Sequence, residues 1–233
     1  MDRELTVSLR RAARGLALAP FRLAGGCVQS PVDAAAPWDD VEGALSPLAP
    51  SQPVRRVLVL PFTAGDAPAG HPALMQAAFA QALRATCGFE VVAPDATELP
   101  RTSREELEKG RVRDVDALIR LHREWQCDAV LAGRLAFSRA HGEPAAGFEL
   151  SLVDARDGSL LWTARDAIDA RIPTTRHSLL RFRAEEAESG EAVPADAAQV
   201  PAESFARFAA VSFVRTLYPG TGSKFPDADD ARR

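Results

Sequence analysis

The side chains in this chain that could act as nucleophiles, bases or metal ligands are few and scattered. Its four histidines are His71, His122, His141 and His177. None of them stands near a carboxylate or a cysteine at the spacing that metal sites use. The serines lack the strand-turn-helix context in which a hydrolase presents its nucleophile. The sequence therefore predicts no catalytic residue, no metal site and no enzymatic activity.

One glycine-rich segment, residues 63–72, has the layout of a phosphate-binding loop, because it follows a predicted strand and precedes a predicted helix. It has neither the G-K-[ST] nor the G-x-G-x-x-G signature, and its prolines remove amide donors. We keep Gly65, Asp66 and Gly70 as a possible ligand loop, which belongs to an alternative interpretation as a nucleotide-binding module. No cofactor is predicted.

Two of the three cysteines, Cys87 and Cys127, each precede a predicted strand. Strands that flank a common neighbour lie about 9–10 Å apart, which is too far for a disulfide. We therefore predict two free, buried thiols at these positions. The acidic residues between Asp154 and Asp157 could suggest calcium, but a hairpin loop is enough to explain them.

The third cysteine ends a segment with the layout of a secretion signal. Arginines at positions 10, 11 and 14 precede an apolar stretch, and the small residues Ala24, Gly25 and Gly26 lead to Cys27. This arrangement resembles a lipobox, in which the cysteine is lipidated and becomes the mature N-terminus. Residues 1–27 are therefore interpreted as a signal with lipidation at Cys27, and the alternative is an ordinary basic amphipathic helix.

Composition limits the other classes of partner. The chain of 233 residues carries 28 basic and 32 acidic residues, a net charge of −4, with no extended basic face of the kind that nucleic acids require. No run of about 20 apolar residues could span a bilayer as a helix. We predict no nucleic-acid partner, and any membrane association comes from the lipid anchor.

The domain boundaries follow from shifts in composition. Residues 28–53 are rich in proline, alanine and serine and are predicted to be a disordered tether. Residues 54–219 are predicted to form one α/β domain, with a core at 54–171 and C-terminal helices at 172–219. Residues 220–233 are predicted to be a tail.

A helix followed directly by a buried strand is the centre of the predicted domain. Residues 114–125 place Val115, Leu118, Ile119, His122 and Trp125 on one helical face, with the residue at 114 as the N-cap. The apolar run that follows is typical of a strand buried on both faces. A helix that leads into such a strand is half of a βαβ unit, which predicts a parallel sheet.

The second half of the domain has a different pattern. Phe148, Leu150 and Leu152 alternate with polar residues, and a hairpin with Gly158 at its turn leads to a returning strand. With apolar strands at 57–60 and 89–93, the fold class is α/β. We expect a single three-layer-like domain whose mixed sheet, first parallel and then antiparallel, has about five strands flanked by helices.

Four stretches in this order resemble the CsgG/LpoB/TolB-N-terminal superfamily of bacterial envelope proteins, many of which are outer-membrane lipoproteins. They are Val57–Phe62, Phe89–Pro94, the helix-to-strand passage Trp125–Arg134, and the hairpin Leu150–Trp162. Relatives carry an LGADYVLVGS-like run at the third stretch and LVDVKTGEILW-like text at the fourth. The resemblance covers about residues 54–171.

The resemblance implies a protein that binds an envelope partner and does not catalyse a reaction, as the LpoB-like activators of penicillin-binding proteins do. A pore former of this superfamily needs added transmembrane hairpins, and the sequence shows no such pair between its core strands. We therefore expect a protein lipid-anchored to the outer membrane on its periplasmic side, with an unidentified envelope protein as partner and homo-oligomers as an option. The alternative is a soluble cytoplasmic α/β module that binds a ligand or a nucleotide.

Overall fold

The computed structural model describes residues 41–45, 53–99, 114–139, 142–188 and 200–217. All of them belong to one compact unit, residues 37–233, and the other unit is residues 1–36. Within the described ranges, no helix is both long enough and apolar enough to cross a membrane. The lipobox-like segment with Cys27 and the C-terminal tail lie outside the described residues, and so does a helix that the capping-box pattern Ser103–Glu106 predicts.

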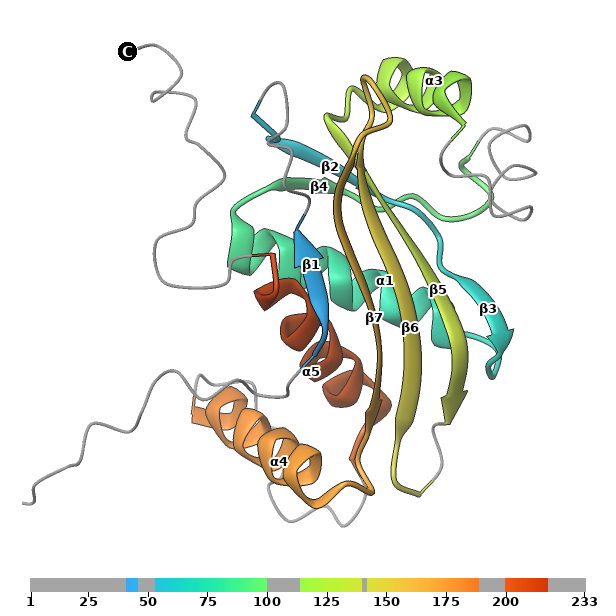
Figure 1. The fold of residues 1–233 in the computed structure, drawn as a ribbon. Helices are drawn as coiled ribbons and strands as arrows, with labels where there is room; N and C mark the ends of the chain where they lie inside the picture. The colour runs from blue at the N-terminus through green and yellow to red at the C-terminus, as the bar shows by residue number, and fades with distance from the viewer. Residues whose placement is uncertain (1–40, 46–52, 100–113, 140–141, 189–199, 218–233) are drawn as a thin grey trace, which may run out of the picture. The chain divides into compact units, whose positions relative to one another are not determined.

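A seven-stranded mixed sheet forms the centre of this unit (Figure 1). Its order is β1-β7-β6-β5-β2-β4, and β3 also pairs with β5. The parallel pairs are β2 with β4, β2 with β5 and β3 with β5, and the other pairs are antiparallel. The predicted change from parallel to antiparallel pairing is confirmed. The strands are β1 Gly43–Leu45, β2 Arg56–Val59, β3 Thr63–Asp66, β4 Glu90–Val92, β5 Ala129–Arg139, β6 Ala145–Asp154 and β7 Leu160–Asp169.

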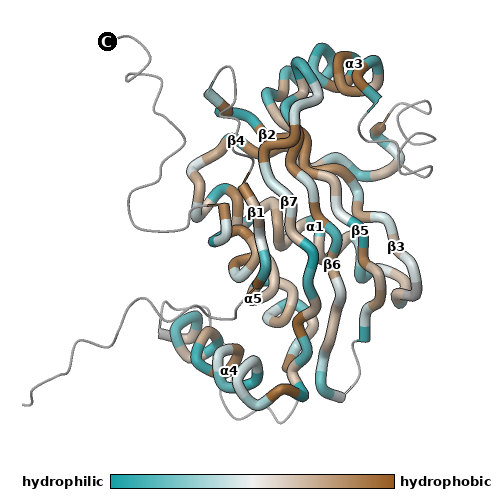
Figure 2. Tube along the Cα trace, in the orientation of Figure 1, coloured by the Kyte–Doolittle hydropathy of each residue, from teal (hydrophilic) through white to brown (hydrophobic). Residues whose placement is uncertain are grey.

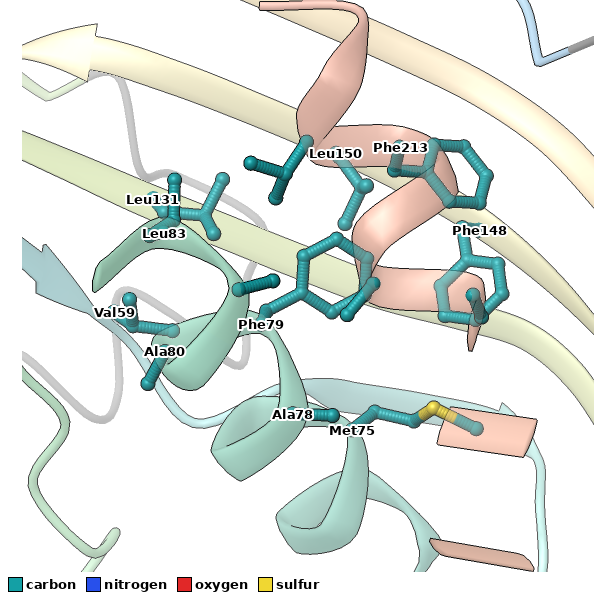
Figure 3. Close-up of a cluster of buried hydrophobic side chains, with 14 of the residues drawn as sticks. Val59, Met75, Ala78, Phe79, Ala80, Leu83, Leu131, Phe148, Leu150 and Phe213 are labelled. Atoms are coloured by element: carbon teal, nitrogen blue, oxygen red, sulfur yellow. The ribbon is translucent and has the colours of Figure 1, made fainter. Parts of the chain in front are cut away.

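Two helices cover one face of the sheet. They are α1 His71–Ala82, which continues as the π-helical turn η1 Leu83–Cys87, and α5 Ala202–Arg215. Figure 3 shows their aromatic side chains meeting those of the sheet, and the ring of Phe148 lies 4.9 Å from Phe213 and 5.8 Å from Phe79. These rings are fully buried. The burial of this apolar face against the sheet is the main force that holds the layers together.

The helix α3 Val115–Trp125 lies on the opposite face and covers only one end of it. Leu118 and Leu121 are buried there against Leu58 and Val130 of the sheet. Asp114 caps this helix as predicted, since its carboxylate accepts a hydrogen bond from the Asp116 amide. The predicted buried stripe is wrong at its first residue: Val115 is 46% exposed, while the buried side of the first turn carries Ala117 and Leu118.

Two short strands appear where the sequence predicts none. Gly43–Leu45 lies within the predicted tether but pairs with β7 as strand β1. Thr63–Asp66 lies within the predicted loop but pairs with β5 as strand β3. Both strands add to the edge of an existing sheet, so their backbone pairing needs no periodic apolar pattern of their own. The sheet is therefore larger than the five strands expected.

Candidate partner-binding face

The sheet face opposite α1 and α5 is polar and solvent-exposed beyond the end that α3 covers. Side chains alternate along each strand, so the neighbours of the buried Phe148, Leu150 and Leu152 must point to this side. Figure 2 shows hydrophilic positions interspersed with hydrophobic ones along β7. We call this surface the open face, and define it by six residues: Arg134 and Phe137 from β5, Glu149 and Ser151 from β6, and Thr163 and Arg165 from β7.

A row of three charges crosses the open face from strand to strand. The register places Arg134 opposite Glu149 and Glu149 opposite Arg165. The carboxylate of Glu149 lies 3.0 Å from the guanidinium of Arg134 and 3.3 Å from that of Arg165. The two arginine side chains are 52% and 81% exposed. Exposed ion pairs stabilise a fold by only ~0–1 kcal/mol each, so this row leaves its charges available to a partner.

An exposed aromatic ring lies on the same face. Phe137 is 41% exposed, and its ring occupies the space that a Cβ on Gly147 would need. A register shift between Leu135 and Phe137 explains its direction. Without that shift, a residue two positions after the fully buried Leu135 would point into the core. The shift therefore turns an aromatic side chain from the core to the open face.

The glycine-rich segment that the sequence indicates as a possible ligand loop is in part a strand. Gly65 lies in β3, where an added Cβ would come within 2.8 Å of the Ala136 carbonyl oxygen. Asp66 pairs through its backbone with Phe137. Only Gly70, with φ of 85°, has the turn role expected of a loop glycine, directly before α1. The close approach of β3 to β5 accounts for Gly65 without a ligand.

The histidines make structural hydrogen bonds. Nδ1 of His71 lies 2.7 Å from the Ser138 hydroxyl and joins the start of α1 to β5. Nδ1 of His122 lies 2.6 Å from the Cys127 carbonyl oxygen and joins α3 to the turn before β5. His177 is exposed on the helix α4 Pro173–Glu188, and His141 lies outside the described residues. Among the described residues, no group of three potential metal ligands occurs.

Neither of the two cysteines in the described residues forms a disulfide, as predicted. They precede β4 and β5, which lie on either side of β2 in the sheet. Cys127 is fully buried, and this burial raises the pKa of its thiol to about 12. Cys87 is only partly buried, so the prediction of two buried thiols is wrong in part. Because of its high pKa, the Cys127 thiol stays protonated at neutral pH, so it is a packing group and not a nucleophile.

The acidic hairpin residues also have local partners. Asp154 is fully buried and accepts hydrogen bonds from the backbone amide and the guanidinium of Arg156. Asp157 accepts a hydrogen bond from the Ser159 amide, and this bond holds the pKa of its carboxyl below the usual value. Gly158 has φ of 75°, as the hairpin turn requires. The predicted hairpin is confirmed, and its acids are explained by turn geometry.

The alternation of Phe148, Leu150 and Leu152 with the polar Glu149 and Ser151 indicated one exposed side of this strand, but the sequence did not show which residues form the open face. Its members come from three strands, and which residues stand opposite each other depends on the register of pairing. The outward direction of Phe137 depends on a bulge, which leaves no clear signal in the sequence. Alternation within one strand was the only sequence signal for this surface.

No protein-family model matches the sequence, and no curated protein matches it. Solved structures are similar over part of the chain. The PelC dodecamer from Paraburkholderia phytofirmans is 18% identical with a TM-score of 0.39, over 56% of this chain and 82% of that one. Lipoprotein GNA1162 from Neisseria meningitidis is 21% identical with a TM-score of 0.36, over 59% and 99%. The LpoB C-terminal domain from Escherichia coli is 16% identical with a TM-score of 0.35, over 52% and 87%. These TM-scores are too low to carry an argument about function.

Proposed function

We propose that this chain is a lipid-anchored protein of the bacterial envelope that acts by binding a partner protein, as LpoB-like proteins do, and not by catalysis. Its place is the outer membrane, on the periplasmic side. The observation that carries the proposal is the open face, where an exposed aromatic ring and a row of charges share one rigid surface.

The chemistry of the open face suits a protein partner. Aromatic and arginine side chains supply most of the binding energy in protein interfaces, and they act best when small or polar groups surround them. Phe137 offers the aromatic group, while Arg134 and Arg165 offer the cations. Ser151 and Thr163 stand opposite each other as one half-exposed pair, which lies between the charged row and α3. A sheet fixes these side chains on a rigid backbone, which lowers the entropy lost on binding.

The anchor is the second part of the proposal. Cys27 follows a charged and apolar segment of signal type, and four stretches of the domain resemble a superfamily rich in outer-membrane lipoproteins. An acyl anchor confines the domain to the membrane surface, so its effective concentration toward a partner in the same envelope rises. A homo-oligomer in which a second copy occupies the open face belongs to the same proposal.

A photocrosslinking amino acid in place of Phe137 tests the binding face in the native host. We expect one adduct of defined mass when the probe stands at 137. A probe at Val115, which is exposed to a similar degree on α3, is the matched control and should give no such adduct. Equal adducts at both positions would contradict a specific face.

Charge reversal gives the test a second readout. Arg165→Glu in the Phe137 probe variant should reduce the adduct about tenfold, since a like charge then meets the partner's acidic group. Arg123→Glu, at an exposed position of α3, should leave it unchanged. If neither substitution changes the amount of adduct, the charge row is not part of the interface.

If the protein keeps Met1 and stays in the soluble fraction, the cytoplasmic module is the better account.

A further inference from the structure

We propose that the outer side of α4 Pro173–Glu188 rests on an anionic lipid surface, so that this end of the domain faces the membrane. The proposal rests on the lipid anchor proposed above and adds an orientation to it. It would leave the open face directed sideways, along the membrane plane, because the strands of β5 to β7 run toward the α4 end.

The helix α4 has two sides of different character. Its inner side carries the buried Leu179 and the ring of Phe182, which lies 5.7 Å from the ring of Phe208 on α5. Its outer side carries four exposed residues at spacings of four, three and four, which form one stripe of a helix. These outer-side residues are Pro173, His177, Leu180 and Ala184.

The outer stripe is more apolar than a solvated helix face requires. Leu180 is 43% exposed on it, and Ile172 just before the helix is 49% exposed. These two are half of the four large hydrophobic residues that are exposed in the described part of the chain. None of these four residues is acidic, but the exposed Glu185 follows Ala184 directly and pairs with Arg181. Apolar side chains next to basic ones are the pattern of helices that lie in a membrane interface.

Two arginines border this stripe, and each of them has an acidic partner. Arg171 pairs with Asp169, and the arginine side chain is far more exposed than the carboxylate. Arg176 pairs with Glu143 of the turn between β5 and β6. The guanidinium of Arg171 is the more exposed member of its pair, so a lipid phosphate could bind it beside Asp169 or in place of Asp169.

The path of the chain favours this end over the other. Strand β1 runs antiparallel to β7, with Leu45 opposite Trp162 and Gly43 opposite Ala164. The chain before Gly43 is therefore directed toward the end of β7 from which α4 begins, and the Glu42 amide bonds Asp166 there. The first described residues, Val41 and Glu42, therefore lie on the side of β1 that is nearer to the α4 end.

The length of the intervening chain sets a limit on other orientations. The 14 residues from Cys27 to Val41 span at most ~50 Å when fully extended. The ten residues of β6 measure ~33 Å. If the opposite end of the domain faced the bilayer, the linking chain would first have to pass along the length of the sheet, which uses most of its maximum span. If the α4 end faces the bilayer, the linking chain does not have to pass along the sheet.

Tryptophan quenching by brominated lipids tests the contact. The mature lipidated protein is reconstituted in vesicles that contain brominated phosphatidylglycerol, with Leu180→Trp or with Val115→Trp as the control. Val115 is equally exposed but lies next to Gly158, at the opposite end of the strands. Trp38, Trp125 and Trp162 are common to both variants and set the background. We expect the added emission at 180 to fall about twofold, since an interfacial helix buries its apolar side ~5–10 Å deep.

The outcomes separate this inference from the proposed function. If both variants float with the vesicles while the tryptophan at 180 is not quenched, whether or not the one at 115 is, the proposed orientation is wrong but the anchor is supported. If neither variant floats, the anchor itself fails. If the probe at 180 is shielded from aqueous iodide but not quenched by bromolipid, a second copy of the chain covers α4, and the lipid contact is overturned. Quenching at 180 that disappears in zwitterionic brominated vesicles would support the anionic surface.

Discussion

At the scale of single residues, the charges that we assign to the binding face are far apart in the chain and adjacent in the fold. Arg134 and Glu149 are 15 positions apart, and their hydrogen bond exists because β5 and β6 pair in one register. A shift of one position would send Glu149 into the core, where an ion is costly to bury. The apolar residues Phe148 and Leu150 prevent that shift. The recognition chemistry therefore depends on the packing of its buried neighbours.

Asp169 gives a prediction about acid stability at the end of β7. Hydrogen bonds from the Arg171 guanidinium hold the pKa of this carboxyl below its usual value. A folded-state pKa below the unfolded one adds stability above the unfolded pKa, about 3.9, and this stability is lost as the pH falls through the folded value. Asp169→Asn should lower the free energy of unfolding at pH 6, and the difference from wild type should shrink below pH ~4.

Urea unfolding at pH 6, 4 and 3 measures this effect. Arg171→Gln is the companion variant, because it removes the group that lowers the pKa of Asp169. In the Arg171→Gln background, Asp169→Asn should have less effect at pH 6 than in wild type. A difference that stays constant down to pH 3 would mean that the carboxylate charge is not what stabilises this end.

At the scale of elements, the helices and long strands that the sequence predicts within the described residues are confirmed, and several of them carry a periodic apolar pattern. The alternation of Phe148, Leu150 and Leu152 and the apolar residues of α5 are such patterns. The sequence could not indicate β1 and β3, because strands of three and four residues at an edge have no period to detect. For the same reason the open face was only partly predictable, since it is assembled from register and from one bulge.

Substitution of a buried aromatic residue should affect mainly stability, and substitution of an exposed one should affect mainly partner binding. Phe213→Ala empties a fully buried site between Phe148 and Phe79 and should lower the free energy of unfolding by about 3–5 kcal/mol. Phe137→Ala removes a half-exposed ring and should cost less than ~1 kcal/mol, while it weakens partner binding. Chemical denaturation measures the first quantity, and crosslinking yield at a neighbouring position measures the second. A large loss of stability in Phe137→Ala would assign that ring to the core.

Strand β1 gives a second element-scale prediction. Gly43 packs against Thr216, so an added Cβ would come within 2.1 Å of the threonine hydroxyl, which also accepts a hydrogen bond from Trp162 Nε1. Gly43→Ala should therefore detach β1 and lower the free energy of unfolding by about 1–3 kcal/mol. Ala44→Ser, at an exposed position of the same strand, is the control and should be near neutral. Equal stabilities of the two variants would mean that β1 adds nothing to the domain.

At the scale of the whole molecule, we propose that a membrane anchor and a linking segment hold a rigid binding domain. The chain enters the sheet from the α4 end, and the open face lies along the strands that run from that end. An anchored domain with this arrangement searches for its partner in two dimensions, because the lipid keeps it bound to the membrane surface. Each part can fail alone, so the parts must be tested separately.

The central claim is the anchor at Cys27, and the most direct measurement is the intact mass and membrane partition of the full chain expressed in a Gram-negative host. We predict loss of residues 1–26, the mass of a diacylglyceryl group on Cys27, and recovery in the membrane fraction. The Cys27→Ala variant should lack this mass and leave the membrane fraction. An unprocessed chain that begins at Met1 and is soluble with or without the substitution would contradict the account.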